Sequence, residues 1–220
     1  MAAVKRFSPL IACLAIAFSV IGFVVGQLVP DPGLDPLNVT ISEYAVADRG
    51  GVTEVAMAIM GLGSIALLAG LRAARAPIAG LPEKLLIAWS AAVVTAAVIP
   101  TTPLGQDPDL AAMVHRGVSV VAFLSLPAAA ALLVPRLSRD ATWKPVARVV
   151  EWLALAGGFG VLAITYVALP GQGVLIGLVE RLLLGAEVAL LAVLAGWLTR
   201  VVWAENRLFT TYHRFIASRS

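Results

Sequence analysis

The residues that could carry chemistry are few, and most of them fall at the same ends of the apolar segments of this chain. The candidate residues for binding a ligand are Ser42, Glu43, Tyr44, His115, Arg116, Glu180, Arg181 and Glu187. Arginine side chains hold anionic groups, and a histidine among carboxylates exchanges protons near neutral pH. We therefore expect an outward-facing polar pocket that binds or transports a small polar solute, an ion or a lipid headgroup.

Glu187 is the most unusual of these residues because it falls in the middle of an apolar run. It lies roughly 20 Å along its predicted helix, at about 1.5 Å per residue, and no lysine or arginine is close to it in sequence. Glu180, seven residues earlier, shares its helical face. A carboxyl group inside a membrane is by default a functional hypothesis. The structural alternative is a glutamic acid bonded to Thr165, Tyr166 or a backbone carbonyl.

His115 and Arg116 fall about two turns into the run that opens with Asp107-Pro108-Asp109. An aspartate cap followed by proline is typical of a helix start, so both side chains lie near the outer interface. Charged residues at such places face the bundle interior or pair with one another. The structural alternative for Arg116 is an ion pair with an acid such as Glu180 or Glu43.

An enzyme is the second function that the residues allow. Ser42, His115 and a carboxylate on one side of the membrane would supply the nucleophile, base and orienting acid of an intramembrane hydrolase. No Gly-x-Ser-x-Gly elbow, P-loop or His-Glu-x-x-His motif occurs in the chain. The two histidines, His115 and His213, fall on opposite sides, which excludes a three-histidine zinc site and a bis-histidine haem pair. The sequence therefore predicts no metal and no cofactor.

An accessory subunit of a membrane complex is the third function. In that case the outer charges are structural, and the partner is another membrane protein or a second copy of this chain. A hydrated cavity that reaches Glu187 favours transport, a Ser42 hydroxyl bonded to an imidazole favours hydrolysis, and a sealed interior with every charge paired favours the accessory role.

Six apolar runs must position these residues. The 220-residue chain is 60% hydrophobic and 13% charged, with a mean hydropathy of +0.93, whereas soluble domains are about 25% charged. Runs of about 20 residues cross a hydrocarbon core of about 30 Å as helices. They lie near 8–29, 52–71, 84–102, 110–134, 146–169 and 174–203. The sequence thus predicts an all-α, six-helix transmembrane domain over 1–203, followed by a basic amphipathic cytoplasmic tail over 204–220.

The basic residues predict the orientation of the bundle. An alternating six-helix path puts 13 of the 16 lysines and arginines on one side and leaves Arg49, Arg116 and Arg181 on the other. The positive side is cytoplasmic, so we expect both termini in the cytoplasm of a bacterial cell, with the bundle in its plasma membrane. The net charge of +3 sits in short loops beside the membrane, which indicates contact with anionic lipid headgroups and not with nucleic acid.

The connection over 30–51 is the longest loop in the predicted topology, and it has few of the small polar residues that are common in solvated loops. Long ordered loops tend to be functional. We expect a lid or re-entrant segment over an outward-facing cavity. The alternative is a solvated loop whose apolar residues dip into the membrane interface.

Four short motifs occur in order at the outer ends of the predicted helices: Ile41-Ser42-Glu43-Tyr44, Ile99-Pro100-Thr101, His115, and Gly177-Leu178-Val179-Glu180-Arg181. With them the chain resembles, over nearly its whole length, the bacterial and archaeal membrane-protein family called domain of unknown function 998. The resemblance implies a six-helix integral membrane protein of unassigned activity. It also implies an aspartate soon after the proline that closes the third helix, where this chain has Thr101 and Thr102.

Overall fold

The structure, a computed structural model, describes residues 2–28, 34–47, 51–102 and 106–217, and the regular structure in these ranges is entirely helical. The helices are α1 (Ala2–Leu28), α2 (Ile41–Ala47), α3 (Val52–Ala73), α4 (Leu81–Val98), α5 (Leu110–Arg139), α6 (Lys144–Ala168) and α7 (Ile176–Ala217). Each except the short α2 contains a span long and apolar enough to cross a membrane. The predicted six-helix, multi-pass membrane fold is confirmed.

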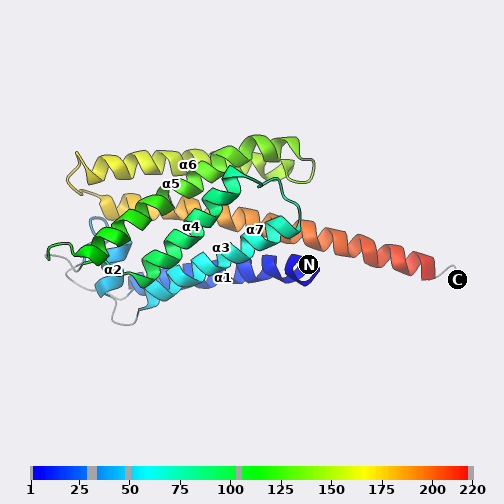
Figure 1. Ribbon diagram of the computed structural model, residues 1–220, viewed down its shortest axis with the longest axis horizontal. Helices are drawn as coiled ribbons and strands as arrows, with labels where there is room; N and C mark the ends of the chain where they lie inside the picture. The colour runs from blue at the N-terminus through cyan, green and yellow to red at the C-terminus, as the bar shows by residue number, and fades with distance from the viewer. Residues whose placement is uncertain (1, 29–33, 48–50, 103–105, 218–220) are drawn as a thin grey trace.

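The six long helices pack side by side in the order α1, α3, α4, α5, α6, α7, and α7 closes the ring against α1 (Figure 1). α7 also contacts α3 and α5, so its inner face lies at the centre of the bundle. The first turn of α1 and the far end of α7 lie at one end of the bundle, as an even number of passes requires (Figure 1). The short α2 lies at the other end, which we call the α2 end.

The predicted spans agree with the helices to within about six residues at each end of the first five runs, and the largest differences lie at the start of α1 and at the end of α5. The fourth run was expected to end at 134, just before Pro135, but α5 continues through Pro127 and Pro135 to Arg139. α1 likewise runs through Pro9. Proline inside a membrane helix is tolerated because neighbouring helices and side chains satisfy the backbone groups it frees.

Glycine allows two pairs of helices to approach closely. A Cβ added at Gly63 of α3 would lie 2.4 Å from Cβ of Ala15 on α1, and one added at Gly157 of α6 would lie 2.9 Å from Cγ of Pro127 on α5. At both positions a larger side chain would push the two helices apart. Small residues of this kind are typical of membrane helix interfaces, where packing drives association.

α7 continues without a break beyond its membrane span, which ends at Ala204, to Ala217. Its last turns project past the bundle at the end opposite α2 (Figure 1). The boundary predicted at 203/204, between a membrane domain and a basic tail, therefore falls inside one helix.

Candidate functional site

The bundle contains a cavity of about 640 Å³ at its α2 end, within the range of small-molecule sites, roughly 300–1,000 Å³. Five long helices and α2 line it. The apolar lining residues are Val20, Phe23, Val24, Ile41, Met57, Met60, Trp89, Val93, Ala96, Ala122, Phe123, Leu184, Gly185, Val188 and Ala189. The polar ones are Gln27, Ser42, Ser119, Glu180 and Arg181.

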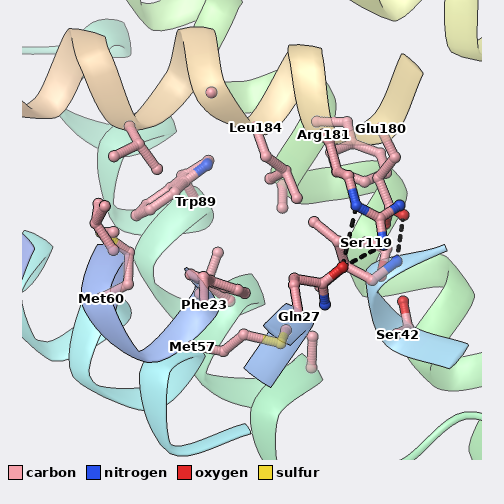
Figure 2. A pocket seen from close by; sticks show the side chains of 18 of the residues that line it. Phe23, Gln27, Ser42, Met57, Met60, Trp89, Ser119, Glu180, Arg181 and Leu184 are labelled. Atoms are coloured by element: carbon pink, nitrogen blue, oxygen red, sulfur yellow. Dashed lines mark hydrogen bonds between the residues drawn. The ribbon is translucent and has the colours of Figure 1, made fainter. Parts of the chain in front are cut away.

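The polar lining residues gather at one end of the cavity. Figure 2 shows Gln27, Ser42, Glu180 and Arg181 together at that end, with Trp89 toward the other. The hydroxyl of Ser119 is engaged, since it donates to the backbone oxygen of its own helix at His115. The cavity therefore has apolar walls and a polar end, which differs from the mainly polar pocket that the charged residues suggested.

Arg181 is the centre of the polar end. Its Nη1 donates to the backbone oxygens of Pro36 (2.8 Å), Val39 (2.9 Å) and Gly177 (2.9 Å). Its Nε donates to Oε1 of Gln27 at 3.2 Å, and Nη2 donates to the same oxygen. The guanidinium thus ties α7 to α1 and to the segment before α2.

The side chain of Arg181 also stacks on α2. The guanidinium carbon lies 5.1 Å from the ring centroid of Tyr44, which is cation–π distance. The hydroxyl of Tyr44 donates to the backbone oxygen of Leu34 at 2.9 Å. Tyr44 is therefore held at both its ring and its hydroxyl.

Local hydrogen bonds explain why α2 forms. Thr40 and Glu43 make a capping box, in which Oε2 of Glu43 accepts from the backbone N and Oγ1 of Thr40 at 2.7 Å each. The backbone N of Glu43 donates back to Oγ1 of Thr40 at 3.3 Å. A capping box satisfies donors that a helix start would leave free. Glu43 is thus occupied by α2 itself.

Glu180 joins α7 to the start of α2. Its Oε2 accepts from the backbone N of Ile41 at 2.7 Å, and the side chain is buried. The backbone N of Leu178 also donates to the oxygen of Leu37 at 3.0 Å. Gly177 permits this approach, since an added Cβ would lie 2.2 Å from the oxygen of Val39.

The segment over 36–45 is consequently an ordered cover at the end of the bundle, with Val39, Ile41, Tyr44 and Ala45 buried. Its burial contradicts a solvated loop, whereas movement as a lid stays a prediction. It also brings two of the family-like motifs together, since Ile41–Tyr44 and Gly177–Arg181 meet here. Of the predicted residues, Ser42, Glu180 and Arg181 line the cavity, and Glu43 and Tyr44 fix α2 beside it.

Glu187 lies just outside the cavity lining and is 2% exposed. Its Oε2 accepts from Nε1 of Trp89, a lining residue, at 3.1 Å, while its Oε1 has no partner among the described residues. The structural alternative, a bond from Glu187 to Thr165 or Tyr166, is not found, because the Thr165 hydroxyl donates to the backbone oxygen of Val161 and Tyr166 is 66% exposed.

His115 is buried. Its Nδ1 lies 2.6 Å from the backbone oxygen of Ile99, the residue after α4, and its Nε2 has no partner among the described residues. No hydrogen bond connects Ser42 and His115 in the part of the chain that the structure describes. The hydrolase arrangement is therefore not assembled.

Arg116 is exposed, and the structure gives it no ion pair with any residue it describes. The expected pairing with Glu180 or Glu43 was wrong. Both acids are occupied by the backbone around α2, and Arg116 follows buried His115 by one residue, which turns it about 100° around α5. Arg49, the third outer arginine, lies outside the described residues.

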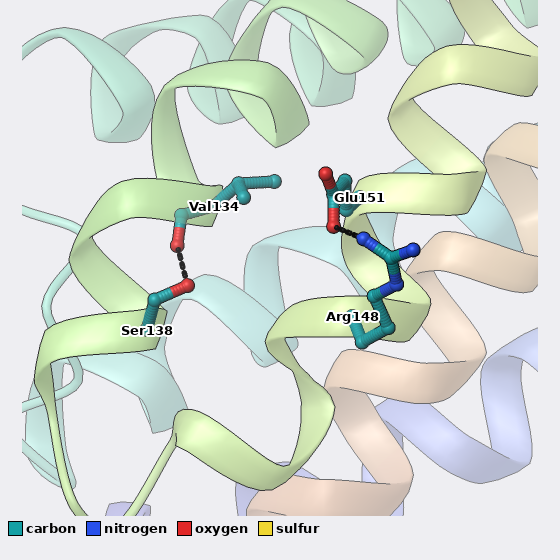
Figure 3. Close-up of polar contacts among 4 residues, drawn as sticks. All are labelled: Val134, Ser138, Arg148 and Glu151. Atoms are coloured by element: carbon teal, nitrogen blue, oxygen red, sulfur yellow. Dashed lines mark hydrogen bonds and ion pairs between the residues drawn. The ribbon is translucent and has the colours of Figure 1, made fainter.

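Within the described ranges, no three histidine, cysteine, aspartate or glutamate side chains are grouped as a metal site would require. The Arg148–Glu151 ion pair (2.7 Å) lies on α6 (Figure 3). Arg148 also makes a cation–π contact with Trp152, and none of these three residues lines the cavity.

Gln27 and Trp89 were not among the residues predicted from the sequence. Gln27 is the single amide at the end of the first apolar run, and Trp89 stands in the middle of its span rather than at an interface. Tryptophan in membrane helices concentrates at the interfaces, so its central position was a usable signal. Neither residue carries a charge, which is why both escaped a search for charged groups.

Residues 11–197 match a family that is described as protein of unknown function, DUF998. No curated protein and no solved structure matches the chain.

Proposed function

The chain belongs to this family of unknown function, and we propose that it binds a single-chain amphiphile of the membrane, with the apolar chain in the cavity and the headgroup at the α2 end. The observation that carries this proposal is the division of the cavity into apolar walls and one polar end.

The walls suit a hydrocarbon chain. Phe23, Met57, Met60, Trp89 and Phe123 line the cavity from four different helices. Methionine side chains adapt to irregular apolar ligands, and burying apolar surface contributes about 25 cal/mol per Å². A flexible chain of methylene groups fits such a surface without needing directed contacts.

A small polar solute or an ion is a poorer occupant of most of this space. Polar groups removed from water need hydrogen-bonding partners, and the cost of burying an unpartnered charge is high. The apolar walls offer none beyond Trp89, whose indole N–H is already bonded to Glu187. Of the three ligand classes expected from the sequence, the lipid headgroup is therefore favoured.

The two other functions have less support. A hydrolase would need Ser42 and His115 in contact, and no hydrogen bond joins them in the described residues. An accessory subunit would have a sealed interior, whereas this bundle holds a cavity of about 640 Å³.

The distribution of basic residues supports an orientation for the site. In the six-helix topology, 13 of the 16 lysines and arginines are expected on the side opposite the α2 end, which favours an outward-facing polar end by the positive-inside rule. We propose that the protein lies in the plasma membrane with both termini in the cytoplasm, and that the surrounding lipids supply the amphiphile.

Binding of the apolar chain can be tested by tryptophan quenching. The purified protein in detergent is titrated with a monoacylglycerol that carries two bromine atoms in mid-chain. Bromine quenches indole fluorescence on contact, and Trp89 lines the cavity. We expect quenching that saturates at a low mole fraction of the probe.

Gly185→Leu is the decisive variant. Gly185 lines the cavity, and a Cβ added there meets nothing within 4 Å. A leucine side chain can therefore extend into the cavity without a clash at its Cβ. Gly196→Leu is the matched control, since Gly196 has the same open space on the same helix but is not a lining residue. Saturable quenching should persist in the control and disappear in Gly185→Leu; its persistence in both, or its absence from the parent, overturns the proposal.

A further inference from the structure

Resting on the proposed function, we infer that Gln27 is a headgroup-binding residue, whose side-chain amide donates to an anionic carboxylate or phosphate oxygen of the amphiphile. Arg181 fixes the orientation of the Gln27 amide, and most acceptors at the polar end of the cavity are already bonded.

Arg181 determines which way the Gln27 amide faces. Both Nε and Nη2 of Arg181 donate to Oε1 of Gln27. An arginine side chain has donors and no acceptor, so it can bond only to the amide oxygen. The amide nitrogen must then lie on the side away from Arg181, as Figure 2 shows.

The nitrogen of this amide is buried and has no acceptor among the described residues. Buried donors without an acceptor are rare in folded proteins, because their lost bond to water is not replaced. Gln27 itself lines the polar end of the cavity. A ligand oxygen at that end would supply the acceptor that the described residues lack.

Other donors at the polar end are also available. Nη2 of Arg181 has a second hydrogen with no acceptor among the described residues, and the Ser42 hydroxyl lines the cavity. The acceptors nearby are mostly engaged, since Oε1 of Gln27 is bonded to Arg181 and Oε2 of Glu180 to Ile41. Free donor hydrogens therefore outnumber the one free carboxylate oxygen, Oε1 of Glu180.

The charge of Arg181 points to the same ligand class. All the hydrogen-bond acceptors of its guanidinium are neutral carbonyl oxygens, those of Gln27, Pro36, Val39 and Gly177. No carboxylate accepts a hydrogen bond from the guanidinium among the described residues; the neighbouring acid, Glu180, bonds to the backbone N of Ile41 and interacts with Arg181 only through space. An ionised oxygen accepts several charge-assisted hydrogen bonds at once, whereas a hydroxyl headgroup would satisfy fewer of these donors.

The test compares three brominated probes with the same chain: a monoacylglycerol, a fatty acid and a lysophosphatidic acid. In the parent protein the anionic probes should bind about tenfold more tightly than the monoacylglycerol, because about a tenfold gain is what one hydrogen bond to a charged group contributes. The fatty acid and lysophosphatidic acid arms distinguish a carboxylate from a phosphate as the preferred source of the oxygen.

Gln27→Glu separates ligand binding from the support of Arg181. It keeps an oxygen for Arg181 and replaces the donor nitrogen with a second oxygen that carries negative charge, so the preference for anionic probes should fall to onefold or below. Gly196→Leu, outside the cavity, should keep the preference. Gln27→Met, which removes the amide donor without adding charge, should also reduce it and serves if Gln27→Glu does not fold.

The outcomes of this test separate the two proposals. Equal affinity for all three probes in the parent, or an unchanged preference in Gln27→Glu, overturns the role of Gln27 and leaves chain binding intact. Failure of every probe to give saturable quenching overturns the proposed function, and the headgroup inference falls with it.

Discussion

Nε1 of Trp89 donates to Oε2 of Glu187 across 3.1 Å, and this bond joins the centre of α4 to the membrane-spanning part of α7. Trp89 lines the cavity, whereas Glu187 lies just beyond it. The most deeply placed acid of the bundle is therefore part of the support of the cavity wall and not a group in contact with the cavity space.

Removing this donor should destabilise the bundle. In Trp89→Phe, Glu187 keeps no hydrogen-bond partner among the described side chains, and the smaller ring fills less space. We expect these two effects together to lower the free energy of unfolding by about 2–4 kcal/mol. Chemical unfolding in detergent, followed by circular dichroism, measures it. The double variant Trp89→Phe/Glu187→Leu should lose less than Trp89→Phe alone; a larger loss would mean that the bond contributes little.

Gly177→Ala should detach the cover of the cavity. The added Cβ would lie 2.2 Å from the oxygen of Val39 and 2.6 Å from that of Pro36, and backbone atoms cannot move away without breaking their bonds to Arg181. We expect faster hydrogen exchange over 34–47, measured by mass spectrometry. Gly196→Ala on the same helix has open space and should leave the exchange of that segment unchanged.

Alanine substitution at two adjacent glycines of α6 should change the free energy of unfolding differently. Gly157→Ala places a Cβ 2.9 Å from Cγ and 3.0 Å from Cβ of the rigid Pro127 ring, so overpacking should cost about 1–3 kcal/mol. Gly158→Ala meets nothing within 4 Å and should be neutral or stabilising by up to about 1 kcal/mol through helix propensity. Thermal unfolding of both variants in one detergent checks this; equal shifts would contradict the α5–α6 contact.

The orientation of the bundle can be read by cysteine labelling. Cys13 is the single cysteine, so Cys13→Ser provides a background for Leu37→Cys at the α2 end and Ala141→Cys at the opposite end, both at exposed positions. A membrane-impermeant maleimide should label Leu37→Cys in intact cells and Ala141→Cys only after permeabilisation. The reverse pattern would invert the proposed topology.

The spans were predictable because the signal is local. An apolar run of sufficient length must be a helix in a membrane, and that rule placed all six. It failed only at details such as Pro135, where neighbouring helices decide whether the helix continues.

The site was predictable in part. Glu180 and Arg181 stood out as charges within an apolar context, and both line the cavity. Arg116 was misplaced, because the direction a side chain takes around a helix depends on tertiary packing. The bonds from Arg181 to Gln27 span 154 residues of sequence, and a pairing of that kind leaves no trace in local spacing.

The length of α7 has a mechanical consequence. Its 42 residues extend about 63 Å, roughly twice the thickness of the hydrocarbon core, and no proline interrupts them. Its first two turns are fastened to the cover through Gly177, Glu180 and Arg181. Because the helix is continuous, a displacement of α7 along its axis would move the cover and the turns that project past the other end of the bundle together.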